Sequence, residues 1–171
     1  MHDRTTMLDT IIEMNRKSAV LYDRASAACS DPLGSMMFAF LHREKETSVW
    51  RAHVAKLSLR GELWTAAPDP VGGGVPPRVL FRRLAARTEP APPPLEREQE
   101  SVELALDMEK AVVGYYSGQF EAAAQDEERR FIETMIASGQ EVILLLTDLQ
   151  YYFSDPHGWV KAAETEGMDT A

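Results

Sequence analysis

The sequence predicts an all-α protein, a bundle of four long helices arranged as two helical hairpins. Apolar residues recur at three- and four-residue spacing along four long segments, breakers separate these segments, and no alternating strand pattern occurs. One domain is expected over 1–171, because this length suits a single core. Its expected parts are a helix pair over 6–60, a crossover over 61–95, a second helix pair over 95–154 and a C-terminal tail over 155–171.

The first helix pair is broken only at Asp31-Pro32, where a helix has to end and a new one can begin. The periodicity predicts helices from Thr6 to Cys29 and from Pro32 to Arg60. The expected inner face of the second helix follows the three- and four-residue steps. It consists of Met37, Phe40, Leu41, Glu44, Ser48, Arg51, Val54 and Leu57.

The segment over 61–95 is rich in proline and contains Gly72-Gly73-Gly74, so no long helix or strand is expected there. One short helix is predicted from Val79 to Arg87. Each flanking half has only two helices, too few to bury a core alone, which favours a crossover connection over a domain linker. Two further long helices follow, and Trp159 is expected to anchor the tail on the bundle.

The two halves align without a gap at an offset of 94 residues, which places Tyr22 on Tyr116 and Asn15 on Glu109. The same offset places Glu44 on Ser138 and Thr47 on Glu141. Chance alignment of amphipathic helices remains the alternative explanation. Two helical hairpins joined by one long crossover are the connectivity of ferritin-like bundles, so the expected fold is a ferritin-like four-helix bundle.

Several stretches resemble the rubrerythrin-related family of ferritin-like di-iron carboxylate proteins. Ala105-Leu106-Asp107-Met108-Glu109 with Tyr115-Tyr116 is similar to the family's third-helix signature, and 41–57 to its second helix. The ending from Tyr151 through Trp159 is also similar. The resemblance implies an iron pair held by a Glu from each of two helices and by Glu-x-x-His from each of the other two.

The resemblance leaves three candidate metal ligands, Glu44, Glu109 and Glu141. The other expected ligand positions hold Asn15, Thr47 and Ser138. We expect the three carboxylates to converge and to bind a divalent metal ion through oxygen, which would be iron by resemblance, in an incomplete site. A metal-free ion network is the alternative, with Arg51 as counter-charge, because buried carboxylates need a partner or a proton.

Two functions therefore stand at this point. One is a rubrerythrin-like protein with an eroded di-iron site, at most an oxidoreductase, although the loss of ligands argues against catalysis. The other is a metal-free ferritin-like binding or assembly module without catalysis. The net charge of −9 argues against nucleic acid and anionic membranes as partners, and a lone Cys29 excludes a rubredoxin module within this chain. A cytoplasmic homodimer is expected, pairing through Met36, Phe38 and Trp50.

Overall fold

The computed structural model describes residues 3–59, 76–87 and 96–168, and these form six helices without a strand, which confirms the all-α class. Four of the helices are long and two are short. Their bounds are α1 Arg4–Ala28, α2 Pro32–Leu59, α3 Pro77–Ala85, α4 Glu96–Ala122, α5 Asp126–Ser154 and α6 Pro156–Met168. Most of the predicted crossover and the chain end lie outside the described residues.

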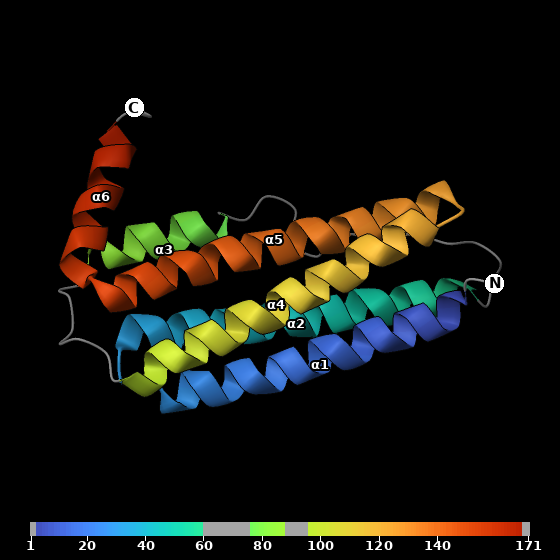
Figure 1. The fold of residues 1–171 in the computed structure, drawn as a ribbon, viewed down its shortest axis with the longest axis horizontal. Coiled ribbons are helices and arrows are strands. Elements are labelled where there is room, and N and C mark those ends of the chain that lie inside the picture. Colours follow the sequence, from blue (N-terminus) through green and yellow to red (C-terminus); the bar gives the residue numbers. More distant parts are fainter. Residues whose placement is uncertain (1–2, 60–75, 88–95, 169–171) are drawn as a thin grey trace.

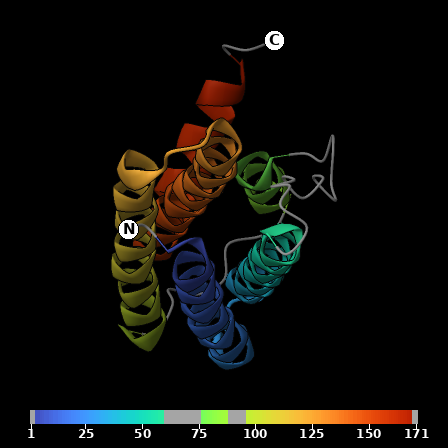
Figure 2. The ribbon, with the colours of Figure 1, turned by 90° about the vertical axis from the view of Figure 1, so that its right-hand side faces the viewer.

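The four long helices lie side by side as two antiparallel pairs, α1 with α2 and α4 with α5 (Figure 1). Helices α2 and α4 run in the same direction, so α4 begins at the opposite end of the molecule from the end of α2. Seen end-on, the two pairs face each other, and α3 lies beside α2 and α5 (Figure 2). In the described part of the chain no helix is long and apolar enough to cross a membrane.

Aspartate side chains cap the N-termini of the two helices of the first pair. The Asp3 carboxylate accepts a hydrogen bond from the backbone N–H of Thr5 at 3.0 Å, which satisfies one free amide at the start of α1. The Asp31 carboxylate accepts from Gly34 N–H at 2.7 Å in the same way, with Pro32 as the first residue of α2. The predicted break at Asp31-Pro32 is therefore confirmed.

The buried apolar side chains form two clusters, one toward each end of the long helices. One cluster contains Tyr22, Leu41, Leu106 and Val142, and the other contains Ile11, Ala52, Val112 and Ile132. Each long helix contributes to both clusters. Between them, every long helix carries a turn with a polar residue or a glycine at its buried position, so the apolar core is interrupted halfway along.

Helices α3 and α6 cover α5 at one end of the molecule through an aromatic group. Trp159 is 3% exposed and its ring centroid lies 4.8 Å from that of Phe81 and 5.9 Å from that of Tyr152. The anchor predicted for Trp159 is therefore confirmed. The helical form of the tail was not expected: Asp155-Pro156 ends α5, but Pro156 also suits the first position of α6, where its missing N–H is not needed.

Beyond Leu41 the inner face of α2 is shifted by one position from the predicted one, because Lys45, Ala52 and Ala55 are buried where Glu44, Arg51 and Val54 were expected. The buried set is Leu33, Gly34, Met37, Phe38, Leu41, Lys45, Ser48, Ala52 and Ala55. Leu57 is 61% exposed, so its inward placement is wrong. Phe38 is 1% exposed and stacks near Tyr22, so it belongs to the core and not to an outer apolar stripe with Met36 and Trp50.

Candidate functional site

A buried polar layer lies halfway along the long helices, between the two apolar clusters. We use this name for Asn15, Ser18, Lys45, Ser48 and Glu109, none of which is more than 4% exposed. Their helices are α1, α2 and α4. On α5, the buried Gly139 packs against Val113, which follows Glu109 by about one turn of α4. Polar groups removed from water need partners, so the hydrogen bonds within the layer determine what it can do.

The only carboxylate of the layer, Glu109, is shared between an ammonium group and a phenol. Lys45 Nζ donates to Glu109 Oε2 at 2.5 Å, and the Tyr22 hydroxyl donates to Glu109 Oε1 at 2.7 Å. Both partners are as buried as the carboxylate, at 3% and 0% exposure. The charge of Glu109 is therefore neutralised by a lysine from α2, and its second oxygen is satisfied by α1.

A second hydrogen bond also crosses from α1 to α4, with the tyrosine on the other helix. Asn15 on α1 donates to the hydroxyl of Tyr116 on α4 at 2.6 Å, whereas Tyr22 on α1 donates to Glu109 on α4. Asn15 and Glu109 are 94 residues apart, as are Tyr22 and Tyr116. Each half therefore supplies a tyrosine that binds the matching residue of the other half.

Both tyrosines are held as neutral phenols. Burial raises the pKa of Tyr22 well above its usual value, and the neighbouring Glu109 carboxylate raises it further. Burial also raises the pKa of Tyr116, against the hydrogen bond from Asn15. Asn15 Nδ2 donates to the Ile11 carbonyl as well, at 2.8 Å, whereas its Oδ1 has no hydrogen-bond partner among the described residues. The layer thus holds one ion pair and neutral donors.

The three carboxylates predicted as metal ligands have different surroundings. Glu44 and Glu141 line one pocket of about 130 Å³ between α2 and α5, together with Ser138. Glu109 does not line that pocket and is bound to Lys45 and Tyr22. Glu141 is exposed, so its inward placement is wrong. Over the described ranges, no three His, Cys, Asp or Glu side chains are grouped to hold a metal ion, and metal binding by these residues stays a prediction.

The remaining residues assigned to ligand positions also differ in placement. Asn15 lies in the polar layer, as expected. The Thr47 hydroxyl instead donates to the Arg43 carbonyl at 3.1 Å on the same helix, at an exposed position. Lys45 supplies the cation that pairs with Glu109, a role that the sequence interpretation gives to Arg51.

Sequence reasoning missed Lys45, although a signal for it was present. The buried small residues Ser48, Ala52 and Ala55 continue at three- and four-residue steps from Leu41 through position 45. A lysine on such a stripe requires an acidic partner, and Glu109 is the only acidic residue on the inner stripe of α4 at that level. Choosing Glu44 by resemblance moved the stripe by one residue.

The polar layer does not fit the iron pair that the resemblance implies. Such a pair needs several carboxylate and imidazole ligands facing one another. The layer offers one carboxylate, and a lysine ammonium already occupies one of its two oxygens at 2.5 Å. A divalent cation there would lie against this ammonium, and like charges in a low-dielectric space repel strongly.

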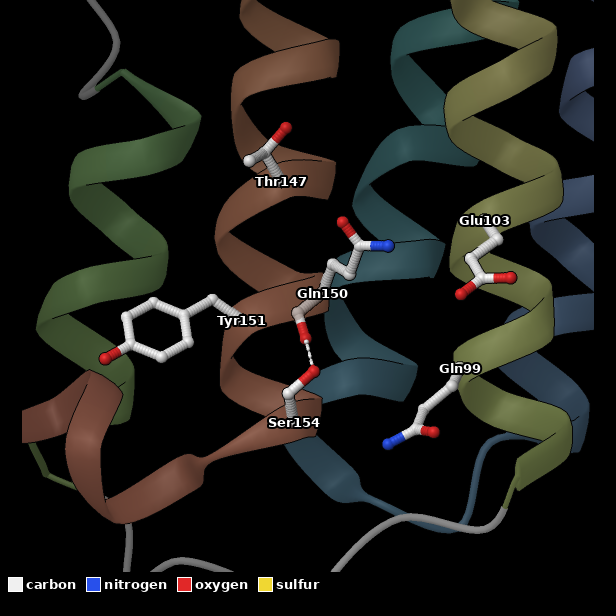
Figure 3. A pocket seen from close by; sticks show the side chains of 6 residues that line it. All are labelled: Gln99, Glu103, Thr147, Gln150, Tyr151 and Ser154. Carbon is white, nitrogen blue, oxygen red and sulfur yellow. Dashed lines mark hydrogen bonds between the residues drawn. The ribbon is translucent and has the colours of Figure 1, made fainter.

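A third region, on the outer surface between α4 and α5, is a shallow polar groove of about 280 Å³. Figure 3 shows Glu103 and Gln99 on α4 facing Gln150 on α5, whereas the ring of Tyr151 points away from them. Ser154 donates to the Gln150 carbonyl at 2.8 Å. Glu103 is the one charged residue that lines this groove, and it is exposed.

Comparisons of this chain with family models, with curated proteins and with solved structures gave no match. The class that the geometry defines is an all-helical protein whose core is divided by an ion-paired polar layer.

Proposed function

We propose that this chain is a ferritin-like four-helix bundle, one domain over 1–171, that works as a non-catalytic binding or assembly module. In this proposal a buried ion pair stands in place of the metal centre. One observation carries it: Lys45 Nζ lies 2.5 Å from Glu109 Oε2 at the centre of the core, where neither group reaches solvent. The lysine supplies the positive charge that a metal ion would otherwise supply.

The arrangement of the halves supports the bundle part of the proposal. The crossing pairs Tyr22–Glu109 and Tyr116–Asn15 join matching positions of the two hairpins. The parallel directions of α2 and α4 agree with a single long connection between the hairpins, as in ferritin-like bundles.

The chemistry of the layer supports a role without catalysis. The two tyrosines that bind to it have raised pKa values, and its one carboxylate is already hydrogen-bonded to Lys45. The Asn15 Oδ1 atom has no hydrogen-bond partner among the described residues. Asn15 is 0% exposed and lines none of the surface pockets described above. What remains for function is the outer surface of the helices.

The rival function is metal binding by Glu44 and Glu141, which share a pocket. The test is to purify the untagged protein from medium supplemented with iron, manganese and zinc, and to measure bound metal by mass spectrometry. We expect far less than one equivalent per chain. We also expect the melting temperature to be the same with and without a chelator, because a ligand stabilises a protein only when it binds the folded state.

A matched variant makes the result specific. Stoichiometric metal that is lost from Glu44→Gln/Glu141→Gln, together with a chelator-dependent melting temperature, would overturn the metal-free proposal in favour of the rival. The same metal lost from Glu109→Gln alone would instead show that the polar layer binds it. Exposed Glu133→Gln is the control, since it should change neither measurement.

A further inference from the structure

The outer face of the α1/α2 pair carries a groove of about 540 Å³. We call it the hairpin groove. Its floor and walls are mainly apolar, with Ala19, Val20, Val49 and Trp50, and charged or imidazole side chains occupy its ends. It lies on the opposite side of α1 and α2 from the buried polar layer and is separate from it.

Two exposed apolar side chains of this helix pair lie in the hairpin groove. Of the eight large hydrophobic side chains that are exposed among the described residues, four lie on α1 and α2: Val20, Met36, Trp50 and Leu57. Val20 is 51% and Trp50 is 44% exposed, and both line the hairpin groove. An apolar patch rimmed by charges is the usual composition of a protein-protein contact surface.

The charges at the two ends of the groove have opposite signs. Asp23 and Glu46 lie at the end nearer the α1/α2 turn, and the His42 ring bridges Glu46 and the Ala19 carbonyl there. Arg16 lies at the other end, where its guanidinium is 3.2 Å from His53 Nε2. On α1 the two signs flank Val20, since Arg16 precedes it by about one turn and Asp23 follows it by about one turn.

We propose that the hairpin groove binds a second copy of this chain, with the α1 helices antiparallel and crossing near Val20. A two-fold axis at Val20 places Arg16 of each copy opposite Asp23 of the other, so these charges pair between two identical surfaces. It also covers Val20 and Trp50. This inference rests on the proposed assembly function, for which it names the partner and the surface.

The charge pattern is what selects a second copy over another partner. A groove for a basic or an acidic partner would carry one sign along its length, whereas this one changes sign about its apolar centre. Such a pattern is self-complementary only under an antiparallel, two-fold arrangement. The surface also replaces the stripe expected from the sequence, because Phe38 lies in the core and cannot take part.

The first test is the mass of the purified full chain in solution, by sedimentation equilibrium across a range of micromolar concentrations. We expect a monomer-dimer equilibrium that Val20→Glu weakens by about tenfold or more, because it places two carboxylates at the centre of the contact. Leu144→Glu is the matched control, since Leu144 is exposed to a similar extent, 42%, on α5. It should leave the equilibrium unchanged.

The second test exchanges the charges. Arg16→Asp makes both positions around Val20 acidic, and Asp23→Arg makes both basic, so each variant alone should be monomeric. An equimolar mixture of the two should form a mixed dimer, and the double variant Arg16→Asp/Asp23→Arg should recover the parental dimer. Circular dichroism checks that each variant is folded, which these exposed substitutions should not alter.

A chain that is monomeric throughout overturns the inference, as does a dimer that is weakened by Leu144→Glu but not by Val20→Glu. A dimer that survives both single charge reversals overturns the antiparallel arrangement. Metal content is measured on the same samples and reports on the proposed function separately. A metal-free monomer would refute this surface alone, and a metal-loaded dimer would refute the metal-free function alone.

Discussion

Lys45 and Glu109 form a buried ion pair between two helices, α2 and α4, that the long crossover separates in the sequence. The Nζ–Oε2 distance is 2.5 Å, and the second carboxylate oxygen accepts from Tyr22. A buried ion pair adds little net stability, because both charges have to be removed from water. Breaking it, in contrast, leaves one charge uncompensated.

Lys45→Met should therefore lower the free energy of unfolding by about 3–5 kcal/mol, because Glu109 would remain buried without a cation. The double variant Lys45→Met/Glu109→Gln should recover most of this loss, since the amide oxygen can still accept from Tyr22 while the charge is gone. Urea unfolding followed by circular dichroism gives both values. Lys17→Met is the control, because Lys17 pairs with Glu13 on the exposed surface of α1. Equal effects of Lys45→Met and Lys17→Met would contradict a buried pair.

Tyr22 should make stability fall at alkaline pH. Its pKa is raised in the folded state, so above the unfolded-state pKa of about 10 the unfolded chain loses a proton that the folded protein keeps. The contribution is fully present below that unfolded-state pKa and is lost as pH rises from there through the higher folded-state pKa. Tyr22→Phe should flatten this decline while lowering stability near neutral pH by about 1.5–3 kcal/mol, the worth of a hydrogen bond to a charged group. The half-exposed Tyr151→Phe should change neither, and urea unfolding at a series of pH values measures both.

Gly139→Ala should destabilise the α4/α5 pair. A Cβ at position 139 would lie 2.5 Å from Val113 Cγ2, which is closer than two carbons can approach. Val113 is β-branched and stiff, so the helices have to move apart, at a cost of about 1–3 kcal/mol. Val113→Ala should rescue Gly139→Ala, because Val113 Cβ is 3.9 Å away.

Gly114→Ala is the opposite control for that experiment. Nothing lies within 4 Å of a Cβ added there, and alanine is the better helix former by about 0.8–1 kcal/mol. Gly114→Ala should therefore raise the thermal unfolding midpoint, whereas Gly139→Ala should lower it. A stabilising Gly139→Ala would show that the two helices are less closely packed than the structure indicates.

The positions of the long helices could be predicted from the sequence, because breakers such as Asp31-Pro32 and continuous periodicity leave few alternatives. The stripes of α1 and α4 were also predictable down to Asn15, Tyr22, Glu109 and Tyr116, since polar residues there are flanked by unambiguous apolar neighbours. Helix α6 was not, because one proline both ends a helix and begins the next.

The candidate site was predicted only in part. On α2, Leu41 fits two adjacent stripes, one through Glu44 and one through Lys45, and periodicity alone does not choose between them. On α5, Ser138, Glu141 and Val142 were expected inside. Val142 is buried as predicted, but Gly139 is buried beside it and Glu141 is exposed. Only the ion pair between Lys45 on α2 and Glu109 on α4 shows which stripe is correct, and that is a long-range relationship.

The polar layer also determines how the two hairpins are aligned along their long axes. Two smooth apolar faces could slide past each other by a helical turn and still bury similar areas. Here such a slip would carry the Lys45 ammonium into one apolar cluster and leave Glu109 buried without a cation. The free-energy cost of a shifted packing is therefore much larger than the net stability that the ion pair adds to the aligned packing. The ion pair therefore selects one arrangement of the helices, and with it the geometry in which α1 presents Val20 to the outside.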